Sequence, residues 1–367
     1  MSCSKLTSSG GALRALSKLN HKGLVCVVVL ASLAGCGGGN ASSEAASEPE
    51  LQREGNTTVI AAEPVLNGQS SSLRTLAGST ASDTGAFGSL IPWPLVPIHA
   101  ALLPDGRVMS FGRDADAASE MFYDIWDPAS GTTESAHLTL PNQIGTDLFC
   151  SNQMLLDNGL VLMAGGDVRD GSNGSVGAQL LKGNQAVNAF NPETNSLTRI
   201  GRLNEPRWYA SMTKLTNGEV FIQGGAIDMT LDQGATRTEV ASADGQHYRS
   251  LSGFSVDDLP WYYPRNFVDA SGQIVGWAHN RSYRIDPRGD GQRTDTGIAP
   301  GVILNNASLA VMYAPGKVLI AGGGATSAVR VDIDSAIPAY EPVPPMNSPR
   351  IWGTATVLPD GKVLVSG

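Results

Sequence analysis

The chain of 367 residues has little positive charge, few cysteines and no long apolar run. It has 25 Lys and Arg against 34 Asp and Glu, giving a net charge of −9 without any basic cluster, so we expect no nucleic-acid partner. The apolar run 24–33 spans only about ten residues, too few for a helix that crosses a bilayer. No helical periodicity follows that run. The remaining chain is therefore predicted to be all-β.

The N-terminal residues resemble a bacterial export signal. Basic residues precede the apolar run, and Leu33-Ala34-Gly35-Cys36 closes it, as in a lipobox whose cysteine is acylated and becomes the mature N-terminus. The alternative is an ordinary signal peptide in which Cys36 has no role. Gly37 follows the cysteine in place of Asp, which by resemblance to lipoproteins of Gram-negative bacteria favours the outer membrane. We therefore expect lipidation at Cys36 and anchoring in the cell envelope, at the outer membrane and periplasm or the cell surface.

Three segments differ in composition. Residues 1–36 form the predicted lipoprotein-type signal peptide. Residues 37–88 are rich in Ser, Ala, Gly, Thr and Glu and poor in aromatics, so they cannot bury enough apolar surface to fold and are predicted to be a disordered tether. Residues 89–367 are long enough for one large folded domain.

A turn motif recurs throughout this third segment. An apolar strand, an X-Gly turn and a Val-rich strand repeat around the turn glycines Gly106, Gly159, Gly218, Gly272, Gly316 and Gly361. A period of about 50 residues with four short strands per repeat is typical of a kelch-type β-propeller. Paired glycines such as Gly165-Gly166 and Gly224-Gly225 end several of the second strands, where backbones are expected to approach closely. We therefore predict an incomplete kelch-type propeller with about six blades.

Cys150 and Tyr209 occupy the same register, because each lies nine positions before the turn glycine of its own repeat. If adjacent repeats superimpose, the thiol and the phenol lie at equal depth and can meet. Once a signal peptide is removed and Cys36 is lipidated, Cys150 is a lone thiol in an oxidising compartment. The simplest alternative is a small buried hydrophobic residue, since cysteine is often buried.

Two segments resemble the copper radical oxidases, the galactose oxidase and glyoxal oxidase family. Asp147-Leu148-Phe149-Cys150 is similar to the family's Asp-x-Phe-Cys, and Arg207-Trp208-Tyr209 to its Arg-x-Tyr segment, in a form closer to glyoxal oxidases. The resemblance implies copper bound by Tyr209, a Cys150–Tyr209 thioether as a protein-derived cofactor, and a seven-bladed propeller. It also implies oxidation of a small aldehyde, primary alcohol or carbohydrate by O2, with release of H2O2.

Other matches to the family are weaker. The resemblance implies substrate contacts for Arg265, Tyr263 and Trp352, with Trp208 as a conceivable substitute for a tryptophan that shields the radical in galactose oxidase. Arg265 fits as well to a surface arginine at a strand end, and Trp352 to packing of an inner strand.

The family's remaining copper ligands have no match in this chain. These are a Tyr-His pair in the seventh blade and a histidine in a C-terminal domain, whereas His99, His137, His247 and His279 stand in no such pair. Because copper(II) prefers a ligand set that contains imidazole, the 367-residue chain is expected to be inactive without further ligands. The competing hypothesis is a surface-anchored propeller that binds glycan or protein and catalyses nothing.

Overall fold

The computed structural model describes residues 88–114, 121–169, 179–299, 305 and 307–367. The chain divides into two compact units, 1–88 and 89–367, and every strand described below belongs to the second. The predicted signal peptide, Cys36 and nearly all of the predicted tether lie outside the described residues. Within those residues no helix is long and apolar enough to cross a membrane.

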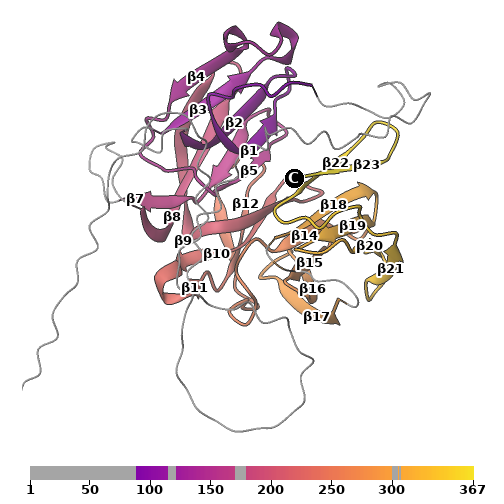
Figure 1. The fold of residues 1–367 in the computed structure, drawn as a ribbon. Coiled ribbons are helices and arrows are strands. Elements are labelled where there is room, and N and C mark those ends of the chain that lie inside the picture. The colour runs from indigo at the N-terminus through magenta and orange to yellow at the C-terminus, as the bar shows by residue number, and fades with distance from the viewer. Residues whose placement is uncertain (1–87, 115–120, 170–178, 300–304, 306) are drawn as a thin grey trace, which may run out of the picture. The chain divides into compact units, whose positions relative to one another are not determined.

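The described part of the chain is all-β, as predicted (Figure 1). Its helical segments are three single turns of 3-10 helix, Pro128–Ser130, Glu134–Ala136 and Met229–Leu231. The strands form antiparallel sheets that follow one another along the chain. The first sheet has the order β1-β2-β3-β4. Its strands are β1 (Leu95–Leu102), β2 (Val108–Asp114), β3 (Phe122–Trp126) and β4 (His137–Pro141).

The second sheet has nine strands and combines two repeats. Its strands are β5 (Asn152–Leu155), β6 (Val161–Ala164), β7 (Asp167–Arg169), β8 (Gln179–Asn191), β9 (Ser196–Lys214), β10 (Val220–Asp228), β11 (Gln233–Gly234), β12 (Thr238–Ala241) and β13 (Tyr248–Leu251). The two repeats share β9, a strand of 19 residues. Its first part, from Ser196 to Arg207, pairs with β8, and its last part, from Trp208 to Lys214, pairs with β10. One continuous strand is therefore the last strand of one repeat and the first of the next.

The later sheets again correspond to one repeat each. Two of them have four strands in sequence order, and a hairpin of two strands follows. Their strands are β14 (Arg265–Val268), β15 (Ile274–Ala278), β16 (Arg281–Asp286), β17 (Gln292–Ile298), β18 (Ser308–Ala314), β19 (Lys317–Gly322), β20 (Ala328–Asp332), β21 (Ala339–Val343), β22 (Thr354–Val357) and β23 (Val363–Ser366).

The predicted turns form the first hairpin of every repeat. The pairs β1–β2, β5–β6, β9–β10, β14–β15, β18–β19 and β22–β23 are antiparallel and close around the six turn glycines. Gly159 and Gly218 have φ of 82° and 84°, a region that residues with a Cβ rarely adopt. The turn residue is therefore set by backbone geometry, which explains why the repeat is visible in the sequence.

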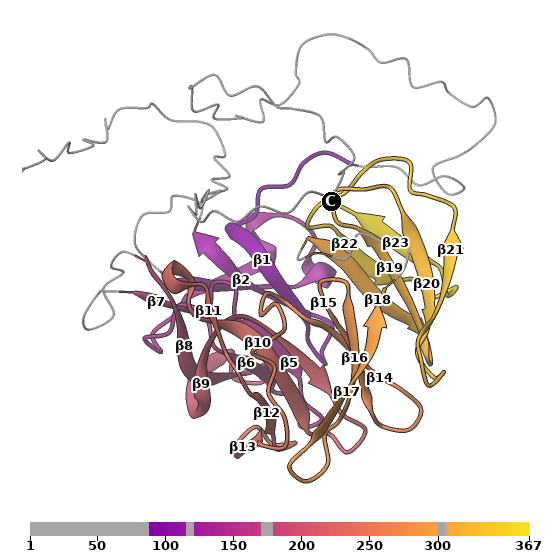
Figure 2. The same cartoon turned by 90° about the horizontal axis from the view of Figure 1, so that it is seen from below.

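The hydrophobic core lies between successive sheets. Met109 and Phe111 of β2 pack with Met163 of β6, which joins the first sheet to the second. In the same way Trp277 of β15 packs with Val318 and Ile320 of β19. Figure 2 shows the sheets that contain β15 and β19 next to each other. Each sheet thus buries one face against the next repeat, as stacked repeat units do.

Candidate functional site

Four of the six residues that lie nine positions before a turn glycine share an unusual backbone conformation. Cys150, Tyr209, Tyr263 and Trp352 have φ of 54°, 68°, 42° and 55°. This left-handed region costs a residue with a Cβ on the order of 1–3 kcal/mol, and strain of this kind clusters at functional sites. All four lie at or just before the start of a repeat's first strand, and only Tyr209 lies within one. In these four repeats the equal register predicted from the sequence is therefore an equal backbone geometry.

Hydrogen bonds between main chains join these positions from one repeat to the next. The Tyr209 N–H donates to the Cys150 carbonyl at 3.1 Å, and the Tyr263 N–H donates to the Tyr209 carbonyl at 2.9 Å. Further along, the Trp352 N–H donates to the carbonyl of Ala307 at 3.1 Å. Ala307 lies nine positions before Gly316, the turn glycine of the preceding repeat. The paired glycines allow this approach, since a Cβ on Gly165 would lie 2.1 Å from the Arg207 carbonyl oxygen.

A side chain replaces the main-chain bond at the step between Tyr263 and Ala307. Arg265 donates from Nη1 to the Tyr263 carbonyl at 2.5 Å and from Nη2 to the Ser308 carbonyl at 2.8 Å. The Ala307 N–H instead donates to Asn305 Oδ1. Arg265 thus bridges two repeats and uses several of its donors on carbonyls. Its predicted substrate contact stays a prediction.

The structure brings the Cys150 thiol against two phenols. Cys150 is 7% exposed. Burial raises the pKa of Tyr209 well above its usual range, and charge and hydrogen-bond interactions with the Cys150 thiol raise it further. Burial and the same thiol likewise raise the pKa of Tyr263. Both phenols are therefore neutral near pH 7 unless a cation stabilises the phenolate.

Aromatic rings cover Tyr209 on two sides. The Trp208 ring lies 4.5 Å from it, centroid to centroid, at an interplanar angle of 32°, and the Tyr262 ring is stacked on it at 4.5 Å and 19°. Tyr263 contacts its edge at 5.4 Å. These separations are typical of attractive ring pairs.

Tyr262 is the site residue that the sequence analysis missed. The signal was present one position before the register residue, where each of four repeats carries a large side chain: Phe149, Trp208, Tyr262 and Ile351.

Trp208 and Trp352, both predicted to contact substrate, differ in how far they are exposed. Trp208 is 2% exposed and donates from Nε1 to the Phe149 carbonyl, so it packs behind Tyr209 and presents almost no surface to a substrate. Trp352 is 50% exposed, and its ring lies 5.8 Å from that of Tyr262. Trp352 can therefore reach solvent and the aromatic cluster together.

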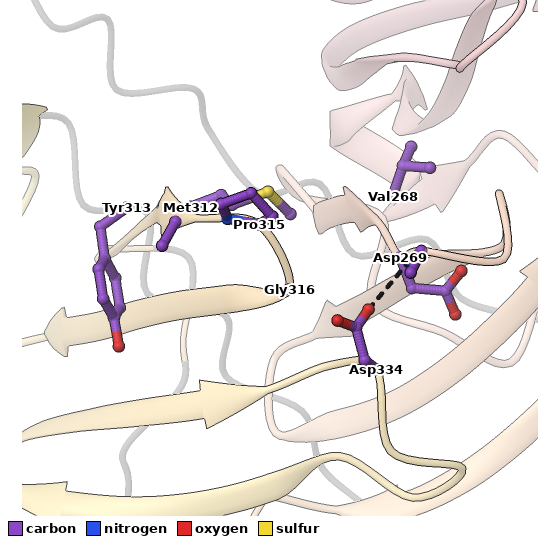
Figure 3. A pocket seen from close by; sticks show the side chains of 9 residues that line it. Val268, Asp269, Met312, Tyr313, Pro315, Gly316 and Asp334 are labelled. Carbon is purple, nitrogen blue, oxygen red and sulfur yellow. Dashed lines mark hydrogen bonds between the residues drawn. The ribbon is translucent and has the colours of Figure 1, made fainter.

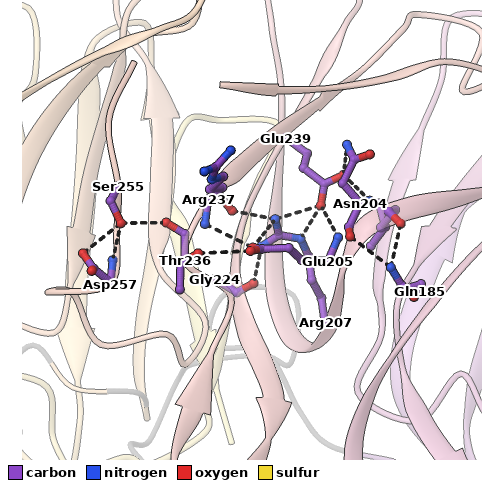
Figure 4. Close-up of polar contacts among 11 residues, drawn as sticks. Gln185, Asn204, Glu205, Arg207, Gly224, Thr236, Arg237, Glu239, Ser255 and Asp257 are labelled. Atoms are coloured by element: carbon purple, nitrogen blue, oxygen red, sulfur yellow. Dashed lines mark hydrogen bonds and ion pairs between the residues drawn. The ribbon is translucent and has the colours of Figure 1, made fainter. Parts of the chain in front are cut away.

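A buried ion pair holds the segment that leads into Tyr209 (Figure 4). Arg207 and Glu239 have fully buried side chains and are joined at 2.9 Å. Arg207 Nη1 donates to the Gly224 carbonyl, and Glu239 Oε2 accepts the Asn204 N–H. The arginine of the Arg-Trp-Tyr segment is thus fixed on three sides, two residues before Tyr209.

The described residues do not complete a copper site. No group of three or more His, Cys, Asp or Glu side chains that could hold a metal occurs among the residues that the structure describes. His137 donates or accepts through Nδ1 with Asp124 at 2.7 Å, and His99 stacks on Phe111. The Tyr209 phenol is a suitable donor, but copper(II) also requires imidazole for tight binding.

A pocket of about 430 Å³ lies away from this cluster (Figure 3). It lies between the β14–β15 turn and the β18–β19 turn, whereas Tyr263 and Arg265 lie at the opposite end of β14. Its two carboxylates bind the protein itself, since Asp269 pairs with Arg284 and Asp334 accepts the Ala270 N–H. The pocket therefore offers little free polar chemistry to a ligand.

Comparison with known proteins supports the fold. No family model matches the chain, and no curated protein matches it. Among solved structures the chain is similar to a fungal alcohol oxidase of the AA5 family in complex with copper, at 18% identity and a TM-score of 0.61. The match covers 76% of this chain and 60% of that protein, so the chain spans less than two thirds of its length. The described residues therefore have an all-β fold similar to that of this alcohol oxidase.

Proposed function

We propose that this chain contributes the cysteine–tyrosine part of a copper radical oxidase of the galactose oxidase and glyoxal oxidase type. The whole protein would oxidise an aldehyde or a primary alcohol with O2 and release H2O2. One observation carries the proposal: Cys150 and Tyr209 come from successive repeats, adopt the same left-handed conformation and are joined by a main-chain hydrogen bond of 3.1 Å, and the Cys150 thiol acts on the pKa of the Tyr209 phenol. The similarity to a copper-bound alcohol oxidase fold supports it.

The site residues present have three tasks in this proposal. Tyr209 supplies a phenol oxygen for copper, and copper supplies the redox partner of the tyrosine when it is bound. Cys150 modifies the Tyr209 ring, while Trp208 and Tyr262 cover the ring and exclude water from it. Because the described residues give no imidazole cluster, we expect the 367-residue chain alone to bind copper weakly and to produce no peroxide from glyoxal, methylglyoxal or galactose.

The thioether is the step that this chain can be tested for. The Cys150 S–H bond and one ring C–H bond of Tyr209 break, a C–S bond forms, and the two hydrogens reduce O2 to H2O2. We expect peptide mass spectrometry, after treatment with copper(II) and O2, to show one cross-linked species that lacks two hydrogens. Cys150→Ser and Tyr209→Phe should abolish it.

Tyr263→Phe is the matched control, because Tyr263 contacts the same thiol. It should leave the cross-link to Tyr209 unchanged. Recovery of two unmodified peptides from the wild type, or a link to Tyr263, would contradict the proposal.

A binding module remains the second candidate, because Trp352 exposes half of its surface beside partly buried Trp261 and Tyr262. Such aromatic faces can pack against sugar rings. Oligosaccharide binding that Trp352→Ala abolishes, in a chain that forms no thioether, would favour this candidate over the oxidase.

A further inference from the structure

A continuous series of ring contacts runs from the protein surface to Tyr209. Trp352 is 50% exposed, and its ring lies 5.8 Å from Tyr262. Tyr262 is in turn stacked on Tyr209 at 4.5 Å. Trp261 also contacts Tyr262, at 5.4 Å, and is partly exposed. All of these side chains are tryptophan or tyrosine, which are readily oxidised by one electron.

Both partners of the inner contact are phenols. An electron and a proton can therefore leave Tyr209 for Tyr262 together, without an unpaired charge in the buried cluster.

Three other tryptophans lack this connection. Trp93 and Trp126 contact each other and His137, and Trp277 donates to the Tyr340 hydroxyl. None of these three has a ring contact with Tyr209 or Tyr262 among the described residues. Ring contacts thus connect Trp352 and Trp261, but none of these three tryptophans, to Tyr262.

We propose that Trp352, Tyr262 and Tyr209 form an electron-transfer path through which a one-electron oxidant in solution oxidises Tyr209. The oxidant takes an electron from the Trp352 indole. Tyr262 then gives an electron to the oxidised indole, and its phenol releases its proton to water. The Tyr262 radical then takes a hydrogen atom from the Tyr209 hydroxyl. In sum Tyr209 loses one electron and one proton, and the oxidant gains the electron. The inference needs neither copper nor the thioether, so it can hold where the oxidase proposal fails.

The test uses the metal-free chain and azide radicals made by pulse radiolysis, which oxidise exposed tryptophan first. In the wild type we expect tryptophanyl absorbance to decay into tyrosyl absorbance at a rate independent of protein concentration. Tyr262→Phe keeps the stacked ring but cannot be oxidised, so most of this intramolecular transfer should be lost. Tyr313→Phe is the matched control, since Tyr313 lies in the pocket at the far end of its strand, and it should behave as the wild type.

The position of the radical gives a second readout. A nitroso spin trap followed by peptide mapping should label Tyr209 in the wild type and Trp352 in Tyr262→Phe. Unchanged transfer in Tyr262→Phe, or trap adducts on Tyr248 and Tyr313 with none on Tyr209, would overturn the proposal.

Discussion

Replacement of Glu239 by Gln tests how firmly the segment before Tyr209 is held. Glu239 and Arg207 are both fully buried, and the carboxylate accepts from Arg207 Nε at 3.1 Å and from Nη2 at 2.9 Å. The variant keeps the shape of the side chain but removes the nearer of the two carboxylates that pair with the buried guanidinium, so that Glu205, at 3.7 Å, is left to compensate its charge. Breaking a buried pair in this way costs about 3–5 kcal/mol. For a domain of this size that loss lowers Tm by roughly 6–20 °C.

Urea denaturation and calorimetry of the 367-residue chain measure this loss. Arg207→Met combined with Glu239→Leu removes both charges, and we expect it to be clearly more stable than Glu239→Gln alone. Glu341→Gln is the control, because that carboxylate pairs with Arg330 at the surface, and it should leave Tm nearly unchanged. A loss below about 1 kcal/mol in Glu239→Gln would show that Glu205 and the Gly224 and Arg237 carbonyls suffice for Arg207, and would refute the reasoning.

Two further predictions concern pH and the N-terminus. Burial lowers the pKa of His99 from 6.5 to about 4, so between these pH values the unfolded chain binds more protons than the folded one. The free energy of unfolding should therefore fall as the pH drops from 6.5 towards 4. His99→Phe should flatten this part of the curve of stability against pH, and an unchanged slope would contradict the prediction. Cys36→Ala should abolish incorporation of labelled fatty acid and release the protein from membranes, and retention of both would argue for an ordinary signal peptide.

The sequence was sufficient for the features that depend on backbone chemistry. Turns such as those at Gly159 and Gly218 need a positive φ, so each hairpin is marked in the sequence by a glycine. Equal spacing from those glycines then placed Cys150 beside Tyr209. Both inferences rest on local rules that hold in every repeat.

Features that depend on packing between repeats could not be predicted in this way. The stacking of Tyr262 on Tyr209 and the bridging role of Arg265 follow from how two sheets approach each other. The burial of Trp208 has the same origin, because its indole finds the Phe149 carbonyl across a repeat boundary. The residue pattern of a single strand does not show how closely the strands of the next repeat approach it.

The long strand β9 has a consequence for how the domain comes apart. The two ends of β9 belong to different repeats. When the strands of one repeat separate, β9 is disturbed, and with it the strand pairing of the other repeat. The region from β5 to β13 should therefore exchange its amide hydrogens as one cooperative unit, while the sheets of β14–β17 and β18–β21 open separately. Tyr209 lies within this unit and Tyr263 beyond it, so local opening of the later repeats would expose one face of the aromatic cluster while leaving Cys150 and Tyr209 together.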